Sequence, residues 1–122
     1  MENKNIPCRL ASLNDFEGCH QGYVTELAEH WIGTLSKEEL KRIVIYACGP
    51  EPMLHAVREF ALKNNIPAQL SVESYMGCGF GLCQGCVIQR NNYEIRDHSY
   101  HKKYSLICLD GPVYEAGDIS FG

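Results

Sequence analysis

Residues 43–50 read IVIYACGP, an apolar run with β-branched side chains that ends in a Cys-Gly-Pro turn. A continuous run of this kind is typical of a strand that is buried on both faces of a parallel sheet. Crossover helices join parallel strands, so helices and further strands are expected in the segments before and after this run. The run therefore predicts an α/β fold.

The segment before this run predicts one strand and two helices. We expect a strand over residues 8–13 and a helix over residues 23–32 that Gly33 ends. Ser36 and Glu39 fit the capping box of a second, short helix. The apolar positions of the first helix follow the spacing i, i+3, i+4, i+7: Val24, Leu27, Ala28 and Trp31.

A helix and a strand follow the run. Pro52 suits a first helical turn, Asn64 and Asn65 suit a helix end, and residues 66–75 hold a further strand. The apolar face of the helix comprises Met53, Leu54, Val57, Phe60 and Ala61. The order strand, helix, strand, helix, strand predicts a partial doubly wound parallel sheet.

The α/β pattern breaks after Tyr75. Residues 76–122 show no helical periodicity, and four glycines crowd around three cysteines within residues 77–86. Short β segments are expected at residues 86–90 and 104–109. We place a domain boundary near Tyr75, with an α/β part over residues 1–75 and a small β-rich domain over residues 76–122.

The cysteines of the second part have a specific spacing. Cys78-x4-Cys83-x2-Cys86, followed by a distant Cys108, matches the plant-type [2Fe–2S] pattern. Glycines let such a loop turn tightly, so that its amide N–H groups face the sulfurs and stabilise added negative charge. The spacing predicts that Cys78, Cys83, Cys86 and Cys108 hold a [2Fe–2S] cluster that passes single electrons.

Other uses of the cysteines fit less well. Zinc knuckles usually come as two C-x-x-C pairs, and only Cys83 and Cys86 form one here, although zinc could replace a lost cluster. Disulfides are disfavoured in a reducing compartment. Cys8, Cys19 and Cys48 have no partner at ligand spacing, and we read Cys8 as a small buried apolar residue.

Composition narrows the function classes. The chain has 122 residues and a net charge of -4, which argues against a nucleic-acid surface. No apolar run approaches the length of a membrane span, and the first residues lack the apolar stretch of a signal peptide. We therefore expect a cytoplasmic protein that binds neither nucleic acid nor membrane.

Cys48, Gly49 and Pro50 lie between a predicted strand and a predicted helix. Ligands of open α/β sheets bind at the carboxyl ends of strands, against helix N-termini, so this turn is placed for a nucleotide. The G-x-G-x-x-G turn that binds a pyrophosphate is absent upstream. We expect no measurable NAD binding by this chain alone.

Several segments together resemble a known family: residues 46–54 (YACGPEPML), 73–86 (ESYMGCGFGLCQGC) and 108–114 (CLDGPVY), with residues 22–25 (GYVT) adding to them. They are similar to the C-terminal half of the electron-transfer subunit of dihydroorotate dehydrogenase class 1B, within the ferredoxin-NADP reductase-like superfamily.

That resemblance implies an order of three domains: an FAD-binding β-barrel, an NAD-binding α/β domain and a small [2Fe–2S] domain. Residues 1–75 would be the C-terminal portion of the NAD domain and residues 76–122 the whole cluster domain. The chain then looks like a fragment without the FAD domain, a component of an oxidoreductase that is not catalytically complete by itself.

The family chemistry belongs to pyrimidine biosynthesis. It implies electron flow from dihydroorotate through FMN in a catalytic partner subunit, the cluster and FAD to NAD, within a heterotetramer. By resemblance Cys78, Cys83, Cys86 and Cys108 are the ligands, and Cys48, Gly49 and Pro50 lie near the nicotinamide. The 21 residues between Cys86 and Cys108 exceed the family's usual spacing, with the extra length in the polar residues 91–103.

Two alternatives stay open at this point. The chain could serve another flavin reductase system, of the hydrogenase or sulfite reductase type, or it could be a non-enzymatic metal-binding module. Two irons with sulfide, against one zinc, would separate the electron carrier from the module, and co-purification with an FMN-containing subunit would separate the two reductase systems.

Overall fold

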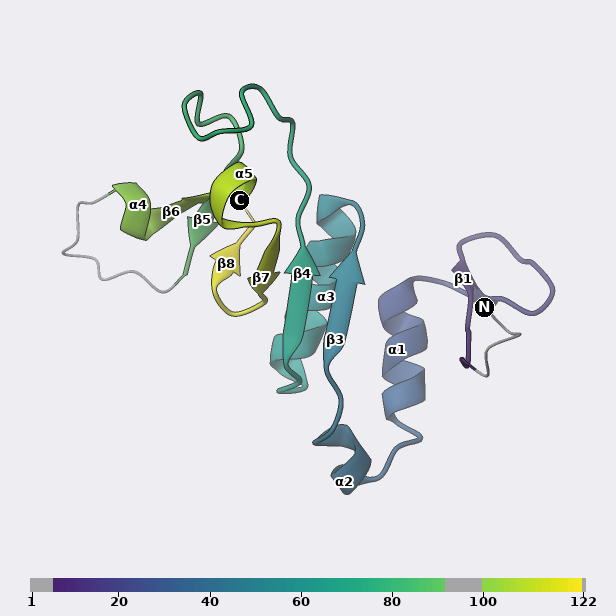
Figure 1. Ribbon diagram of the computed structural model, residues 1–122. Coiled ribbons are helices and arrows are strands. Elements are labelled where there is room, and N and C mark those ends of the chain that lie inside the picture. Colours follow the sequence, from purple (N-terminus) through teal and green to yellow (C-terminus); the bar gives the residue numbers. More distant parts are fainter. Residues whose placement is uncertain (1–5, 92–99, 122) are drawn as a thin grey trace. The chain divides into compact units, whose positions relative to one another are not determined.

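The computed structural model describes residues 6–91 and 100–121 (Figure 1). The chain forms two compact units, Met1–Lys41 and Arg42–Gly122. Each unit is described by itself below.

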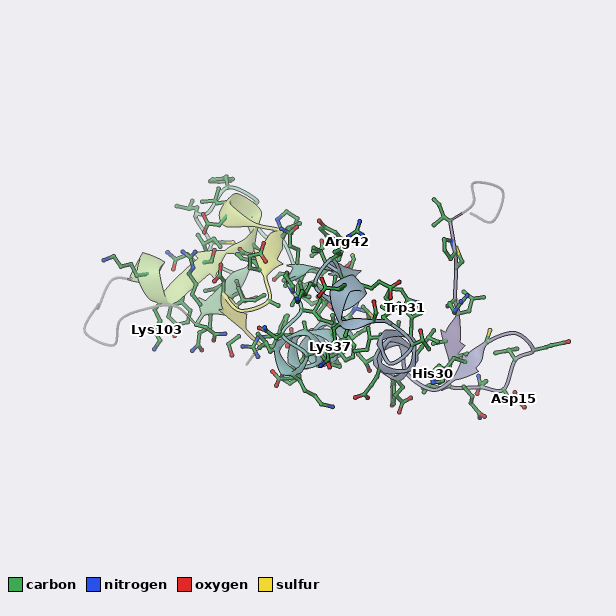
Figure 2. All side chains as sticks on the ribbon, turned by 90° about the horizontal axis from the view of Figure 1, so that it is seen from below. Asp15, His30, Trp31, Lys37, Arg42 and Lys103 are labelled. Carbon is green, nitrogen blue, oxygen red and sulfur yellow. The ribbon has the colours of Figure 1, made fainter. Side chains whose placement is uncertain are left out.

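The first unit holds a two-stranded sheet and two helices. β1 (Ala11–Ser12) pairs in parallel with β2 (His20–Gln21), so only the end of the strand predicted over residues 8–13 is paired. α1 (Val24–Ile32) ends at Gly33, as predicted, but none of its residues is buried. Figure 2 labels Trp31, which lies on this helix. Its side chain is 44% exposed. The apolar spacing thus predicted the helix correctly, although within residues 6–41 its apolar face packs into no buried core.

The capping box of the second helix is confirmed. α2 (Lys37–Leu40) begins after Ser36, whose hydroxyl oxygen accepts the backbone N–H of Glu39 at 3.3 Å. The Glu39 carboxylate in turn accepts the backbone N–H of Ser36 at 2.8 Å. Two donors that the helix itself leaves without partners are satisfied in this reciprocal way.

The central sheet of the second unit is mixed. β3 (Ile45–Cys48) pairs in parallel with β4 (Ala68–Ser71), and β7 (Val113–Glu115) pairs with β4 in the antiparallel sense. α3 (Glu51–Lys63) is the crossover between β3 and β4, with Pro52 in its first turn and Asn64 as its C-cap. The parallel pair and its crossover helix are therefore present, in a sheet of order β3-β4-β7.

The structure corrects the burial predicted for β3. Its side chains alternate between half-buried and exposed, and Tyr46 is 75% exposed. β3 is an outer strand of this sheet, and α3 packs on β3 and β4. A continuous apolar run indicates only that each side chain tolerates burial. It therefore did not predict that alternate side chains of β3 are exposed to solvent.

A second antiparallel sheet has the order β6-β5-β8. It comprises β5 (Val87–Arg90), β6 (Tyr104–Leu106) and β8 (Ile119–Ser120). The strand expected over residues 104–109 stops at Leu106, because α5 (Ile107–Asp110) follows as a single helical turn. α4 (Tyr100–Lys103) is another four-residue turn. Neither turn is long enough to show helical periodicity, so the sequence pattern did not indicate either of them.

One apolar core joins the two sheets of the second unit and α3. Leu54 of α3, Leu70 of β4 and Ile119 of β8 are fully buried and belong to the same cluster. The domain boundary near Tyr75 stays a prediction, and β7, which follows that position, pairs with β4, which precedes it.

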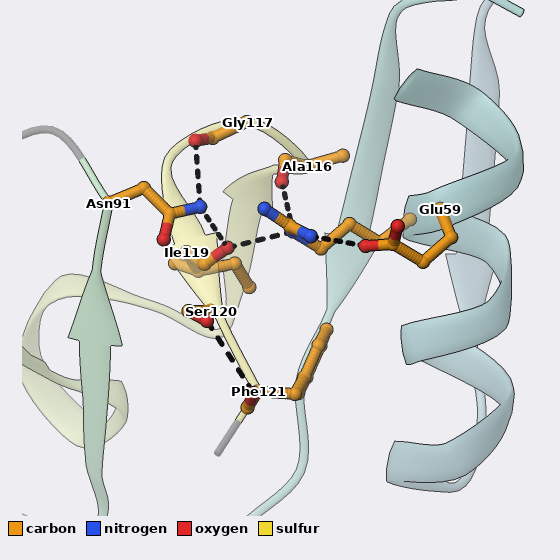
Figure 3. Close-up of polar contacts among 8 residues, drawn as sticks. Glu59, Asn91, Ala116, Gly117, Ile119, Ser120 and Phe121 are labelled. Carbon is orange, nitrogen blue, oxygen red and sulfur yellow. Dashed lines mark hydrogen bonds and ion pairs between the residues drawn. The ribbon is translucent and has the colours of Figure 1, made fainter. Parts of the chain in front are cut away.

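Polar contacts fix α3 to the turn between β7 and β8 (Figure 3). The Nε–H of Arg58 donates to the carbonyl oxygens of Ala116 at 3.0 Å and Ile119 at 2.9 Å. The Nδ2 of Asn91, just after β5, donates to the carbonyl oxygens of Ile119 at 2.7 Å and Gly117 at 3.2 Å. Side chains from two elements therefore hold the same turn.

Among the described residues, the helices are too short and too polar to cross a bilayer.

Candidate metal centre

An irregular loop between β4 and β5 carries three of the predicted ligands (Figure 1). Gly79 and Gly81 have positive φ angles of 74° and 84°, which only glycine adopts without strain. These turns fold the loop back on itself after Cys78. Cys83 is exposed, Cys78 is half-buried, and Cys86 is buried where the loop enters β5.

The Cys78 sulfur faces the backbone of its own loop. Its Sγ accepts the N–H groups of Leu82 and Cys83, each at 3.3 Å. Hydrogen bonds from the backbone of this loop, that of Cys83 first and that of Phe80 second, lower the pKa of the Cys78 thiol to about 6. Backbone donors favour the thiolate, which is the form that binds a metal.

Cys86 and Cys108 form a second pair. The backbone N–H of Cys108, in α5, donates to the Sγ of Cys86 at 3.4 Å. This hydrogen bond is the main cause that lowers the pKa of the Cys86 thiol. The pKa of the Cys108 thiol is raised, mainly because that thiol donates a hydrogen bond to the Cys86 sulfur. The backbone of Gly81 acts on Cys108 in the opposite sense, so the cysteine loop also reaches α5.

The remaining loop cysteine has the same kind of neighbour. The backbone N–H of Gly85 donates to the Sγ of Cys83 at 3.5 Å, and a Cβ on Gly77 would lie only 3.0 Å from that sulfur. The sulfurs of three predicted ligands, Cys78, Cys83 and Cys86, thus each accept a backbone N–H.

The structure brings the predicted ligands together in two pairs, Cys78 with Cys83 and Cys86 with Cys108. It does not gather three or more His, Cys, Asp or Glu side chains into one metal-binding group within residues 6–91 and 100–121. The donor chemistry nevertheless fits an iron–sulfur cluster, because four thiols with surrounding amides are what such clusters bind. Residues 91–103, predicted to loop out between Cys86 and Cys108, fall largely outside the described residues.

Two of the other cysteines, Cys8 and Cys48, are both exposed. Cys8, expected to be buried, is exposed, as are all of residues 6–10, so this described segment before β1 packs into no core. Cys48 is also exposed, at the end of β3. It lines a pocket of about 190 Å³ on the sheet with Tyr46, Ala47, Gln69, Ser71 and Val113.

The Cys-Gly-Pro turn stands where the sequence predicted it, between β3 and α3. Pro50 is the N-cap of α3, and a Cβ on Gly49 would collide with the end of the Met53 side chain. The turn thus joins the carboxyl end of a parallel strand to a helix N-terminus. Its role in binding a nucleotide stays a prediction.

Sequence reasoning missed a polar group next to Cys108. Ser105, Asp110 and Tyr114 are joined by hydrogen bonds around α5. The signal was present, since Ser105 is a polar residue within the otherwise apolar strand β6, and Asp110 directly precedes the Gly-Pro pair.

Comparisons with known proteins agree with this chemistry. Residues 73–120 match the model of the iron–sulfur cluster binding domain of dihydroorotate dehydrogenase B. The segment matched therefore includes all four predicted ligands.

Curated relatives extend the similarity to most of the chain. Dihydroorotate dehydrogenase B (NAD(+)) electron transfer subunits from Caldanaerobacter subterraneus and Bacillus caldolyticus are 37% and 38% identical over 101 and 105 residues, covering 83% and 84% of this chain. An Aquifex aeolicus homologue is 34% identical over 113 residues, or 93% of the chain. The chain spans about a third of the length of these relatives, 36%, 35% and 37% respectively.

A solved structure shares the fold. It is described as an NADH-dependent reduced ferredoxin-NADP oxidoreductase that provides insights into flavin-based electron bifurcation, and it superposes with a TM-score of 0.69. At 17% identity, the alignment covers 92% of this chain and 34% of the other chain. The mixed α/β architecture with small sheets is therefore one that this class of reductase contains. Through residues 73–120, the chain belongs to the family of the iron–sulfur cluster binding domain of dihydroorotate dehydrogenase B.

Proposed function

We propose that Cys78, Cys83, Cys86 and Cys108 hold a [2Fe–2S] cluster, and that the chain relays electrons within an NAD-linked dihydroorotate dehydrogenase of pyrimidine biosynthesis. The observation that carries this proposal is the set of backbone amides that donate to three of the four sulfurs, those of Cys78, Cys83 and Cys86, within a segment that matches the family's cluster-binding domain. Such a cluster, when bound, accepts and releases one electron at a time.

The protein's part in this chemistry is to hold the sulfurs and compensate charge. The N–H groups of Leu82 and Cys83 point at Cys78, and that of Cys108 points at Cys86. Donors of this kind stabilise negative charge on sulfur and thereby raise a reduction potential. The x4 spacing before Cys83 and the distant position of Cys108 favour this cluster over a zinc ion.

The surroundings of the cysteines support a protein partner. Apolar side chains that flank them are exposed, at 98% for Tyr75, 66% for Phe80, 76% for Leu82 and 59% for Leu109. Exposed apolar side chains in one region mark interaction surfaces. We assign this surface to the FMN-containing catalytic subunit, which the family implies as the partner in a heterotetramer.

FAD and NAD are cofactors of the whole enzyme in this proposal. Cys48, Gly49 and Pro50 would lie near the nicotinamide, at the carboxyl end of β3. The chain alone should not bind NAD, because it lacks a pyrophosphate-binding turn, and a calorimetric titration tests this. No disulfide joins any of the seven cysteines, all of which lie among the described residues, and this suits a reducing compartment and supports the cytoplasm as the location.

Metal analysis of anaerobically purified protein tests the ligand set. We expect two irons with two sulfides per chain and a visible charge-transfer spectrum in the wild type. Cys83→Ser should lose or bleach this spectrum, whereas the matched variant Cys8→Ser, which changes an exposed cysteine of the first unit, should keep it. One zinc without sulfide in the wild type, or an unchanged spectrum in Cys83→Ser, would contradict the proposal.

Co-purification tests the partner. Leu82→Gln should weaken capture of the chain by an FMN-containing dihydroorotate dehydrogenase subunit, since it removes an exposed apolar side chain beside Cys83. Leu62→Gln is the matched control, because Leu62 is also exposed, at 47%, but lies on α3. Equal capture of both variants would argue against the surface around the cysteines.

A further inference from the structure

Ser105 is buried, with 2% of its surface exposed, in the middle of β6. Its Oγ lies 2.7 Å from the Oδ2 of Asp110 and 3.1 Å from the hydroxyl oxygen of Tyr114. A buried hydroxyl is retained in a core only when it is hydrogen-bonded, and here both neighbours are polar.

The directions of these hydrogen bonds follow from proton counting. A carboxylate only accepts, so the hydroxyl of Ser105 donates to Asp110. Ser105 has then used its only proton and must accept from Tyr114. Burial raises the pKa of Tyr114, which keeps its hydroxyl protonated and able to donate. The chain of donors therefore runs from Tyr114 through Ser105 and ends on the Asp110 carboxylate.

Asp110 has a second task at the start of α5. The same Oδ2 accepts the backbone N–H of Leu106, the N-cap residue of α5, at 3.1 Å. At the other end of this helical turn, the N–H of Gly111 donates to the carbonyl oxygen of Ile107 at 3.2 Å. The Asp110 carboxylate, at the end of α5, thus binds the backbone of the residue that precedes α5. The N-cap residue itself, Leu106, makes no side-chain capping hydrogen bond.

Cys108 lies inside the turn that Asp110 closes. The N–H of Cys108 points at the Sγ of Cys86, and the N–H of Ile107 donates to the carbonyl oxygen of Cys86 at 3.0 Å. Both contacts depend on the direction of the backbone in α5. If the turn relaxed, the distant ligand and the amide donor for Cys86 would be displaced together.

We propose that Asp110, held by Ser105 and Tyr114, is a positioning residue that fixes Cys108 and its N–H against Cys86 for metal binding. This inference rests on the proposed function, because it assigns Cys108 and Cys86 as ligands. It does not require Asp110 to touch the metal.

The experiment follows iron release from the full chain to a chelator, together with the electron paramagnetic resonance spectrum of the reduced protein. Asp110→Ala should release iron about tenfold faster than the wild type, since a hydrogen bond to a charged acceptor is lost at two donors. Its reduced spectrum should shift or broaden. Asp110→Asn keeps an acceptor oxygen and should restore both properties to within about threefold of the wild type. The matched control Asp15→Ala removes a carboxylate from an exposed loop of the first unit and should behave as the wild type.

Each result bears on the inference. Wild-type release and an unchanged spectrum in Asp110→Ala would overturn it while leaving the ligand assignment in place. Failure of Asn to rescue would also overturn it, since charge rather than the accepted hydrogen bonds would then matter. If Asp110→Ala does not fold, as judged by circular dichroism, Ser105→Ala decides in the same way, with faster release in support and unchanged release against. A wild type without iron would overturn the proposed function, and this inference with it.

Discussion

The backbone N–H of Cys108 lies 3.4 Å from the Sγ of Cys86, a hydrogen bond between residues 22 positions apart. Strand pairing makes this contact possible, because Val87 of β5 faces Leu106 of β6 in the antiparallel register. Cys86 directly precedes Val87, and Cys108 follows Leu106 by two residues, so both cysteines lie at the same end of this strand pair. The pairing thus brings the distant fourth thiol to the loop that carries the other three.

Gly111 should not tolerate a side chain. A Cβ there would lie 2.9 Å from a ring carbon of Tyr114 and 3.0 Å from the carbonyl oxygen of Ile107. Tyr114 is buried and Ile107 offers backbone, so neither can move away cheaply. We expect Gly111→Ala to lower the free energy of unfolding by about 1–3 kcal/mol in urea titrations.

Gly117 is the control for this substitution. No atom lies within 4 Å of a Cβ at that position, so Gly117→Ala should be close to neutral. Equal destabilisation by the two alanines would mean that crowding at Gly111 is not the cause.

Leu54 should dominate the core of the second unit. It is fully buried in α3, and Leu54→Ala is expected to lower the free energy of unfolding by about 2–5 kcal/mol. Leu62→Ala, on the same helix but 47% exposed, should lose much less. Chemical denaturation of both variants checks the pair, and a Leu54→Ala loss below about 1 kcal/mol would contradict the burial of this side chain.

Arg58 should contribute through its carbonyl partners rather than through its ion pair. Arg58→Ala removes the donor to the carbonyl oxygens of Ala116 and Ile119, the second of which keeps the donor from Asn91, and should cost about 2 kcal/mol of unfolding free energy. Glu59→Gln removes only the largely exposed ion-pair partner, which is expected to change stability by less than about 0.5 kcal/mol. A larger effect at Glu59 than at Arg58 would reverse this assignment.

Glu39 should make the capping box of α2 sensitive to acid. The hydroxyl of Ser36, followed by its backbone N–H, lowers the pKa of the Glu39 carboxyl below its usual value. A folded-state pKa that is lowered adds stability above the unfolded-state pKa, and that stability is lost as the pH falls through the folded value. The capping box of α2 should therefore weaken only in acid.

A nuclear magnetic resonance titration of the Glu39 carboxyl carbon measures this shift. Ser36→Ala removes the first cause and should move the midpoint of Glu39 back toward its usual value. An unchanged midpoint in Ser36→Ala would show that the side chain of Ser36 is not responsible.

Local patterns in the sequence predicted local structure well. Pro52 and Asn64 marked the first turn and the C-cap of α3, and Ser36 with Glu39 marked the start of α2, since each feature depends on residues within one or two turns. The cysteine spacing likewise pointed to the segment that the family model matches.

Long-range features were not predictable in the same way. The pairing of Leu70 with Tyr114 joins segments that no local pattern relates, so the antiparallel addition of β7 went unforeseen. The helical turn that holds Cys108 was read as a strand, because Ile107 and its neighbours are apolar in either conformation. The hydrogen bonds of Ser105 depend on that turn and were missed with it.

The chain leaves the central sheet after Val72 and returns to it at Pro112, where the N–H of Val72 donates to the carbonyl oxygen of Pro112 at 2.9 Å. During folding, pairing β4 with β7 must close a loop of about 40 residues. A metal cluster that already joined Cys78 to Cys108 would leave only about 12 residues to close, which lowers the entropic cost by about 1 kcal/mol. Loading with iron would therefore also speed the docking of the last strands, so that metal supply and the rate of chain maturation become coupled.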